Sequence, residues 1–529
     1  MISQIKFKRK LICALCAFLW LVLFPFGTNA QLTLSERRGK EIYLRGTSPS
    51  GREITGRIGE IDVPASTVSC AGCHGMRGEG KTEGGVTAGN LTWPNLSKPY
   101  GHTHPTGRKH GPFTESAFIR AVVNGVDSDG NNLQVVMPRY NLSVEDMADL
   151  IAYVKRIDTD LDPGLTDTGI KIGLVLPMQG ALADVSAAMK DVFTAYFDDL
   201  NNRGGIFSRK IDLRVADAGG GGASTASVAQ TFARNEQIFA FVGGLSAGAD
   251  EQIAALAREE QIPFIGPSTL LPYAETPANR YLFYLLPGVA EQAVSLVNFA
   301  SAQPELRNAR VAIVHSDNPL GAAAAAAAEE HLKKSGQRVE AKQLYTSINF
   351  DARRIVNDLK SKSAEVVFFF GSGKEQTLLL NEAVAANWTP HLFFLGVMTG
   401  KELPASVTAF KNKIYIAFPT LPADLHTEGV AEFRSLHEKY KFPPRHTASQ
   451  LAAFAAAKVF VEGLTRAGRD LSREKLITSL EGLYEYQTGI TPRITFGPNR
   501  RVGAAGAHVV AIDLAEKEFA TANGWIKAY

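Results

Sequence analysis

The chain has 529 residues, of which 45% are hydrophobic and 21% are charged, and its formal net charge is +3. This length exceeds what one ordinary hydrophobic core accommodates, so two to four domains are expected. The nearly balanced charge gives no reason to expect nucleic acid as a partner.

The first thirty residues differ in composition from the rest of the chain. A basic head precedes an apolar run over residues 11–26, and small residues end the segment at Ala30. This order is typical of a secretory signal peptide, so we expect cleavage near Ala30/Gln31 and a periplasmic protein. The alternative is a retained membrane anchor, but the run is shorter than the roughly 20 residues that span a bilayer. Cleavage would change the net charge from +3 to −1 through loss of Lys6, Lys8, Arg9 and Lys10.

Residues 69–75 contain two cysteines two residues apart, Cys70 and Cys73, followed directly by His74. This is the pattern for covalent attachment of haem, in which each thiol adds across a vinyl group and the imidazole becomes the proximal iron ligand. A thioredoxin-like redox pair would require an adjoining βαβ pattern. A structural zinc site would require further ligands at suitable spacing. We therefore predict one covalently attached haem c.

Met137 is a candidate for the second axial ligand. It precedes Pro138 and a strongly periodic helical pattern over residues 144–157, in which Ser143 is expected to cap the amide of Asp146. A proline favours an extended conformation at the preceding residue, from which a thioether could reach iron. Methionine also often fills hydrophobic cores, so a packing role is the alternative.

Three further histidines, His102, His104 and His110, lie in a segment without regular periodicity. Imidazole binds many metals, so these side chains could bind a metal or compete for the haem iron. We interpret the segment as a solvated polar loop, because neither an acidic partner nor a regular spacing supports a metal site.

Residues 31–160 resemble a class I cytochrome c. The resemblance implies an all-α domain whose first and last helices cross at glycine and aromatic positions, with His74 and Met137 as axial ligands and one-electron transfer as the activity. A long insertion before Cys70, over residues 46–68 and without sustained periodicity, departs from the family pattern. The matching positions outside the haem motif are Gly39, Tyr43, Met137, Pro138, Leu150 and Tyr153.

Residues 161–168 have the composition of a linker, and beyond them apolar strands alternate with helical patterns. This alternation indicates parallel sheets, and some 360 residues exceed one usual core, so two α/β lobes are expected over residues 169–529. The predicted strands comprise residues 170–176, 211–215, 238–242, 264–265, 311–314, 366–370 and 392–395.

This second part resembles the type I periplasmic binding proteins that serve branched-chain amino-acid ABC transporters. The resemblance lies in the order of secondary-structure elements and in the amino-acid sequences of residues 172–177, 199–205, 241–246 and 265–268. It implies two lobes joined by a hinge that close around a small ligand, and an ABC transporter permease as a partner.

Ser246, Ser268 and Thr269 follow predicted strand ends, where ligands bind in open α/β sheets. They match positions from which amino-acid receptors of this family bind a carboxylate, although helix capping is an equal alternative. Residues 396–398 lack the acidic residue that would pair an α-ammonium group, and an unpaired buried ammonium is costly. The expected ligand is therefore a small carboxylate or another small molecule, and a domain that has lost its ligand and serves as a docking scaffold is the alternative.

The sequence thus predicts an exported c-type cytochrome that passes single electrons to a periplasmic redox partner protein and carries a fused binding or docking domain. The alternative is a solute receptor of an ABC importer with an accessory haem domain. We do not expect an enzyme, because a haem enzyme needs an open iron position.

Overall fold

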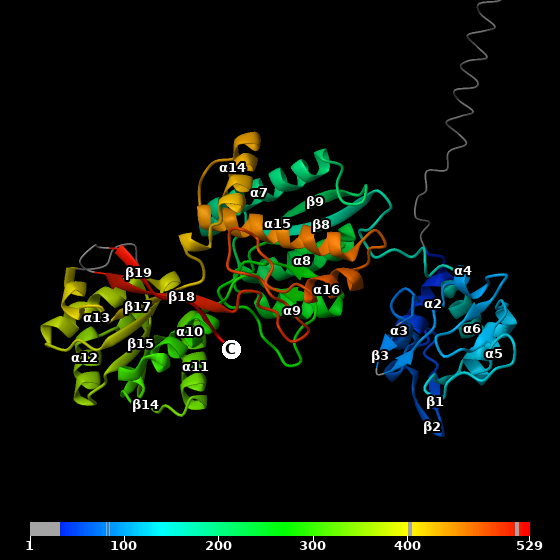
Figure 1. Cartoon of the computed structure of the whole chain (residues 1–529), viewed down its shortest axis with the longest axis horizontal. Coiled ribbons are helices and arrows are strands. Elements are labelled where there is room, and N and C mark those ends of the chain that lie inside the picture. Colours follow the sequence, from blue (N-terminus) through cyan, green and yellow to red (C-terminus); the bar gives the residue numbers. More distant parts are fainter. Residues whose placement is uncertain (1–31, 81, 84, 400–404, 514–517) are drawn as a thin grey trace, which may run out of the picture. The chain divides into compact units, whose positions relative to one another are not determined.

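The computed structural model describes residues 32–529 apart from residues 81, 84, 400–404 and 514–517. The chain divides into two compact units, Met1–Leu161 and Asp162–Tyr529, which are coloured from blue to cyan and from teal to red in Figure 1. The signal peptide predicted for residues 1–30 and its cleavage site lie outside the described residues. In the part of the chain that is described, no helix combines the length and apolarity needed to cross a membrane.

The first unit is mainly helical. Its helices are α2 (Leu34–Arg45), α3 (Cys70–His74), α4 (Trp93–Leu96), α5 (Glu115–Asn124) and α6 (Val144–Val154). As the sequence predicts, the Ser143 hydroxyl caps α6 by accepting from the amide of Asp146 at 3.0 Å. The short strands are β1 (Thr55–Ile58), β2 (Ile61–Pro64), β3 (Thr82–Glu83), β4 (Val86–Thr87), β5 (His102–Thr103), β6 (Lys109–His110) and β7 (Arg139–Asn141).

The insertion before Cys70 is more regular than the sequence suggests. Strands β1 and β2 form an antiparallel hairpin, and β1 also pairs with β7, which follows it by some eighty residues. Strands of four residues are too short to show a periodicity, and their pairing with β7 depends on the tertiary fold.

Helices α2 and α6 cross at a very close approach. A Cβ atom on Gly39 would lie 2.6 Å from the carbonyl carbon of Asp149 and 2.8 Å from Cβ of Tyr153. The rings of Tyr43 and Tyr153 pack beside this point, with centroids 5.7 Å apart. The predicted crossing of the first and last helices at glycine and aromatic positions is therefore confirmed.

The second unit has two α/β lobes. The sheet of the first lobe has the order β12-β11-β10-β8-β9 and is parallel throughout. Its strands are β8 (Gly169–Leu176), β9 (Lys210–Asp217), β10 (Ala240–Val242), β11 (Phe264–Ile265) and β12 (Leu282–Phe283). Its helices are α7 (Ala183–Asn202), α8 (Gly222–Glu236), α9 (Asp250–Glu259), α14 (Thr427–Tyr440), α15 (Thr447–Ala467) and α16 (Arg473–Glu481).

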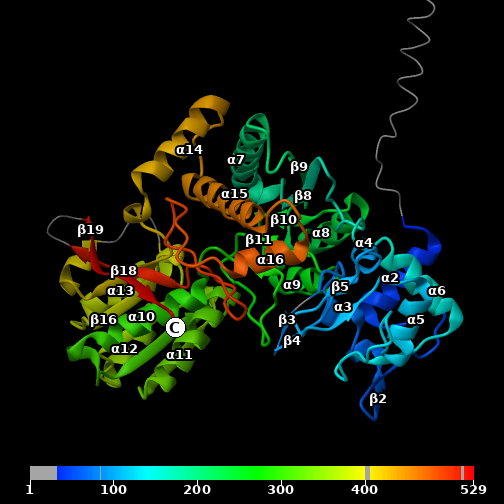
Figure 2. The same cartoon turned by 45° about the vertical axis from the view of Figure 1, so that its right-hand side comes forward.

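The sheet of the second lobe has the order β14-β13-β15-β16-β17-β18-β19, and its last two strands are antiparallel. Its strands are β13 (Val311–Ser316), β14 (Val339–Tyr345), β15 (Val366–Phe370), β16 (His391–Leu395), β17 (Ile414–Phe418), β18 (Gly506–Asp513) and β19 (Glu518–Lys527). Its helices are α10 (Val289–Ala302), α11 (Pro319–Lys334), α12 (Ala352–Ser361) and α13 (Gly373–Ala385), and they cover both faces of the sheet (Figure 2).

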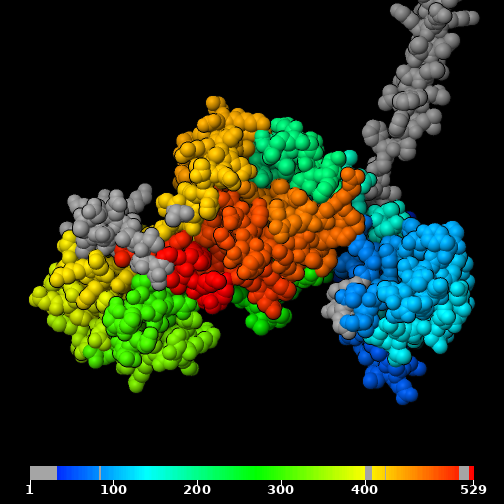
Figure 3. Space-filling view, viewed as in Figure 1, coloured from blue at the N-terminus to red at the C-terminus, as the bar shows by residue number. Residues whose placement is uncertain are grey.

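The chain passes between the lobes three times, after β12, after β17 and before β18. In the space-filling view the C-terminal residues, orange to red, cover the middle of this unit (Figure 3). They first return to the first lobe as α15 and α16, and then lead to the second lobe as β18 and β19. The predicted parallel sheets and the two-lobed architecture are thus confirmed.

We expect Gly39→Ala to destabilise the first unit by about 3 kcal/mol, because the added methyl group would meet the backbone of α6. Urea unfolding of the haem-loaded protein, followed by the haem absorbance, measures this change. Gly72→Ala is the matched control, since its Cβ would have only the hydroxyl oxygen of Ser69 at 3.8 Å. Equal stability of the two variants would contradict the assigned close crossing.

Candidate functional site

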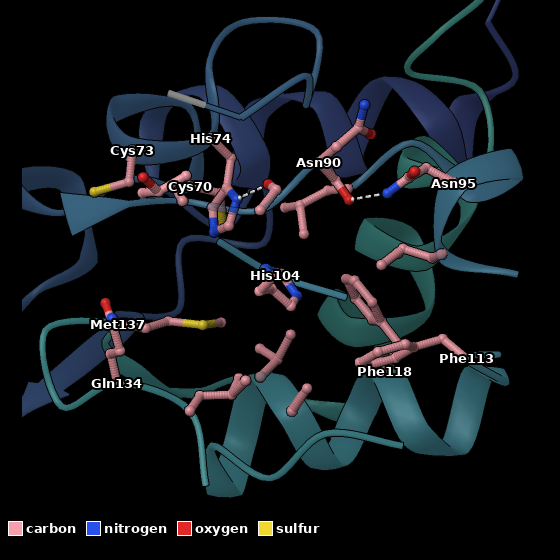
Figure 4. Close-up of a pocket in the computed structure, with 18 of the residues that line it drawn as sticks. Cys70, Cys73, His74, Asn90, Asn95, His104, Phe113, Phe118, Gln134 and Met137 are labelled. Atoms are coloured by element: carbon pink, nitrogen blue, oxygen red, sulfur yellow. Dashed lines mark hydrogen bonds between the residues drawn. The ribbon is translucent and has the colours of Figure 1, made fainter. Parts of the chain in front are cut away.

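A large cavity lies in the first unit between α3, α5 and the segment that precedes β7 (Figure 4). It encloses about 1420 Å³ of space outside protein atoms, its open mouth included. Apolar side chains make up much of its wall, including Leu91, Leu96, Phe113, Phe118, Ala121, Val122, Leu133, Leu150 and Val154.

The structure brings all four predicted haem residues to this cavity, since Cys70, Cys73, His74 and Met137 belong to its lining. The His74 ring is 9% exposed and points into the cavity in Figure 4. Its Nδ1 lies 2.7 Å from the carbonyl oxygen of Gly89. Because a carbonyl oxygen only accepts, Nδ1 donates, which leaves the Nε2 lone pair free for a metal. Burial lowers the pKa of His74, so the ring is neutral at neutral pH, as a ligand must be.

Cys70 and Cys73 occupy one turn of α3, which begins at Cys70 and ends at His74. Cys70 is half-buried and Cys73 is exposed. Burial raises the pKa of the Cys70 thiol to about 12. Reactive cysteines of Cys-x-x-Cys redox pairs have lowered pKa values, so this environment does not suit a thioredoxin-like pair.

Met137 is half-buried and is held by the side chain of Arg139, which the sequence does not single out. The Arg139 guanidinium donates to the carbonyl oxygen of Met137 and, at 3.1 Å, to that of Leu133. The Met137 amide donates to the carbonyl oxygen of Gln134 at 3.1 Å. Gly125, with φ of 69°, leaves room for the guanidinium, since any Cβ there would overlap it. The loop that presents the thioether is thus fixed by its own backbone and by one arginine.

His102, His104 and His110 also line the cavity, so the interpretation of their segment as a solvated loop is wrong. Strands β5 and β6 form a hairpin in which His102 is directly opposite His110. His104 follows His102 by two residues, so the pleat brings it to the same face. Sequence periodicity could not detect a hairpin with two-residue strands.

The residues of the cavity fit haem c. Two cysteines share one helical turn, the adjacent imidazole has a backbone partner on the nitrogen that does not bind metal, and the walls are apolar. Cys70 and Cys73 would hold the group covalently, and His74 and Met137 would be its axial ligands. Bound there, haem c supplies one-electron exchange at its iron.

A second cavity lies in the second unit, where the carboxyl ends of β10 and β11 meet the segments that lead to the second lobe. Ser268 and Thr269 line it, whereas Ser246 does not: Ser246 is 2% exposed, and its amide lies 3.3 Å from the carbonyl oxygen of Ser268. The Thr269 hydroxyl accepts from the amide of Leu271 at 2.9 Å and so stabilises a local turn; it does not cap a helix, since the next helix begins at Val289.

Helix α15 contributes residues to this cavity that the sequence did not indicate. Ala448, Ser449, Ala452 and Ala455 lie on one face of the helix, and their small side chains leave the space open. No charged side chain is among the described residues that line the cavity, which are otherwise Leu245, Gly266, Pro267, Ser268, Thr269, Leu270, Leu285, Leu286, Pro287, Pro419 and Thr491.

Comparison with known protein families agrees with the description of both units. The family model of the periplasmic binding protein matches residues 169–517, which is more than half of the chain. The chain belongs to this family. The family model of cytochrome c matches residues 65–158, so a cytochrome c domain precedes the periplasmic binding protein domain. That domain implies covalently bound haem c.

Relatives of the periplasmic binding protein domain include Leu/Ile/Val-binding protein homolog 8 of Brucella abortus, which is 23% identical over 63% of this chain and 85% of its own length. A Leu/Ile/Val-binding protein of Rhizobium johnstonii is 24% identical over 63% of this chain and 89% of its own.

Two solved structures share the fold of this domain. A branched chain amino acid ABC transporter protein from Thermus thermophilus with bound valine has a TM-score of 0.52 and 19% identity, over 68% of this chain and 97% of its own. A fatty acid ABC transporter substrate-binding protein from Thermomonospora curvata has a TM-score of 0.52 and 16% identity, over 70% of this chain and 95% of its own.

We expect Arg139→Gln to weaken the bond between Met137 and haem iron by roughly tenfold, because residues that orient a metal ligand typically contribute that much. The absorbance band of methionine-ligated ferric haem reports the fraction of protein in which the bond is made. Gly125→Ala should act in the same direction by displacing the guanidinium. Arg57→Gln, which removes an exposed ion pair with Asp62, is the control. An unchanged band in both test variants would refute the role assigned to Arg139.

Proposed function

We propose that the protein is an exported c-type cytochrome that carries single electrons through one covalently bound haem c, while its periplasmic binding protein domain binds a small molecule. The observation that carries the first part is the convergence of Cys70, Cys73, His74 and Met137 on one apolar cavity. Both families are typically periplasmic, which agrees with export and with a redox partner protein in that compartment.

The residues around the cavity have distinct roles in electron transfer. His74 is held in one tautomer by Gly89, and Met137 is held by Arg139, so both axial positions are arranged in advance. Apolar walls exclude water and help to set the reduction potential. Met137 would occupy the iron position that a haem enzyme keeps open, which supports an electron carrier.

The second cavity supports a ligand that is small, largely apolar and without a positive charge. Its described lining offers hydroxyl and backbone groups but no charged side chain. A zwitterionic amino acid would leave its ammonium group without an anionic partner, at a high cost. A weakly polar molecule or a small carboxylate suits the lining better, and we propose an ABC transporter permease as a second partner.

We expect the oxidised wild-type protein to be low-spin with a methionine-to-iron absorbance band, and Met137→Ala to lose that band and become high-spin. The reason is that the substitution removes the only thioether proposed to bind the iron. Met76→Ala is the matched control, because Met76 is not part of the cavity lining. A high-spin wild-type protein would refute the assignment of Met137.

We expect weakly polar alcohols, esters or carboxylates, and not leucine or valine, to raise the unfolding temperature of the second unit. At a hundred times its Kd a ligand stabilises by about 2.7 kcal/mol, which calorimetry detects. Ala452→Leu should abolish the effect by filling the cavity, whereas Ala467→Leu, on the same helix outside the cavity, should retain it. Stabilisation by leucine that survives Ala452→Leu would contradict the proposed ligand and site.

A further inference from the structure

The rings of His102, His104 and His110 form a cluster in the lining of the haem cavity, here called the histidine cluster. The ring centroids of His102 and His104 lie 4.7 Å apart, those of His104 and His110 5.3 Å, and those of His102 and His110 5.9 Å. All three belong to the cavity lining. In the view of Figure 4 the His104 ring lies at a level between His74 and Met137 and to one side of them.

Burial and then the charge of His110 lower the pKa of His102, and two cations add to this effect. These cations are Lys98, after α4, and Arg108, in the turn of the same hairpin. Burial and then Arg108 lower the pKa of His104 to about 4. The acid that opposes this effect is Asp127, after α5.

Asp127 does not neutralise the histidine cluster. Its carboxylate is fully buried and is paired with the Arg108 guanidinium. It also accepts from the amides of Asp129 and Asn131, at 3.0 and 2.9 Å. The acid that acts on His104 is therefore already paired with a cation and with backbone amides.

An organic anion suits this site better than a metal ion. In the described part of the chain, no group of three or more His, Cys, Asp or Glu side chains is arranged to hold a metal. His110 donates Nδ1–H to the carbonyl oxygen of Gly111, 2.8 Å away, so its Nε2 can donate to a carboxylate only when the ring is protonated. Haem c carries two carboxylates at one edge of an otherwise apolar ring, which matches a cavity whose lining combines apolar walls with the three imidazoles and Arg108.

We propose that His102, His104 and His110 bind the propionate carboxylates of haem c and take up protons when the haem is reduced, so that the reduction potential depends on pH. This inference rests on the proposed function. A carboxylate beside an imidazole favours its protonated form. When a one-electron donor reduces the iron from Fe(III) to Fe(II), the added negative charge favours that form further, and the imidazoles take a fraction of a proton from solvent.

The thermodynamic linkage between proton binding and reduction of the haem determines the sign of the pH dependence. Protonated imidazoles stabilise the reduced haem more than the oxidised haem, so lowering the pH raises the potential and raising the pH lowers it. The same coupling requires net proton uptake on reduction, which can be measured without any substitution.

The test uses the full-length, haem-loaded protein and measures its midpoint potential between about pH 5 and pH 8, across the range in which histidine titrates. We expect the wild-type potential to fall as the pH rises, and the triple variant with His102→Gln, His104→Gln and His110→Gln to lose most of this dependence. His331→Gln, in the second unit, is the control and should keep it. A triple variant with the full wild-type dependence would overturn the proposal.

A second measurement covers the case in which the triple variant does not take up haem. Reduction of the wild-type protein in weakly buffered solution should consume protons, and the absence of proton uptake would also overturn the proposal. Stoichiometric Zn²⁺ binding to the wild-type protein that His104→Gln abolishes would identify a metal site instead. Failure of the proposed function can be distinguished from failure of this inference, because in the former case the wild-type protein would lack covalent haem or the methionine-to-iron band.

Discussion

The contact between the backbones of α2 and α6 at Gly39 is the constraint on which the haem domain depends. It allows Tyr43 and Tyr153 to pack beside the crossing. The Tyr43 hydroxyl then donates to the carbonyl oxygen of Gly75, 2.8 Å away, which fixes the residue directly after His74. The close approach of α2 and α6 thus determines the position of the His74 imidazole. A side chain larger than hydrogen at residue 39 would disturb both the helix crossing and this position.

Features encoded in neighbouring residues could be predicted from the sequence. The helical pattern over residues 144–157 contains α6, and the seven strands predicted by range begin and end within two residues of the observed bounds, whereas no range was predicted for β12, β14, β17, β18 and β19. These elements have continuous apolar runs or clear caps, so local chemistry determines them. The approach of Met137 to the haem motif was also predictable, because the resemblance to cytochrome c supplied the long-range information that periodicity lacks.

Features that depend on distant partners could not be predicted. Arg139 acts through carbonyl groups of the preceding loop, and His74 through the carbonyl group of Gly89, and no spacing rule links these residues. The pairing of β1 with β7 and the gathering of three histidines by a two-residue hairpin are likewise products of the tertiary fold. Ser246 follows the expected strand yet is buried outside the ligand cavity, because a strand end fixes a residue's position but not its exposure.

Because the chain returns to the first lobe as α15, this lobe is completed late in synthesis. Phe197 and Tyr196 of α7 pack against Phe460 and Phe454 of α15, which are synthesised more than 250 residues later. The parallel strands of the second lobe, β13 to β17, are contiguous in sequence and can pair before that point. Until α15 is available, the first lobe therefore leaves the rings of Tyr196 and Phe197 without these partners, and exposed apolar surface of this kind favours aggregation.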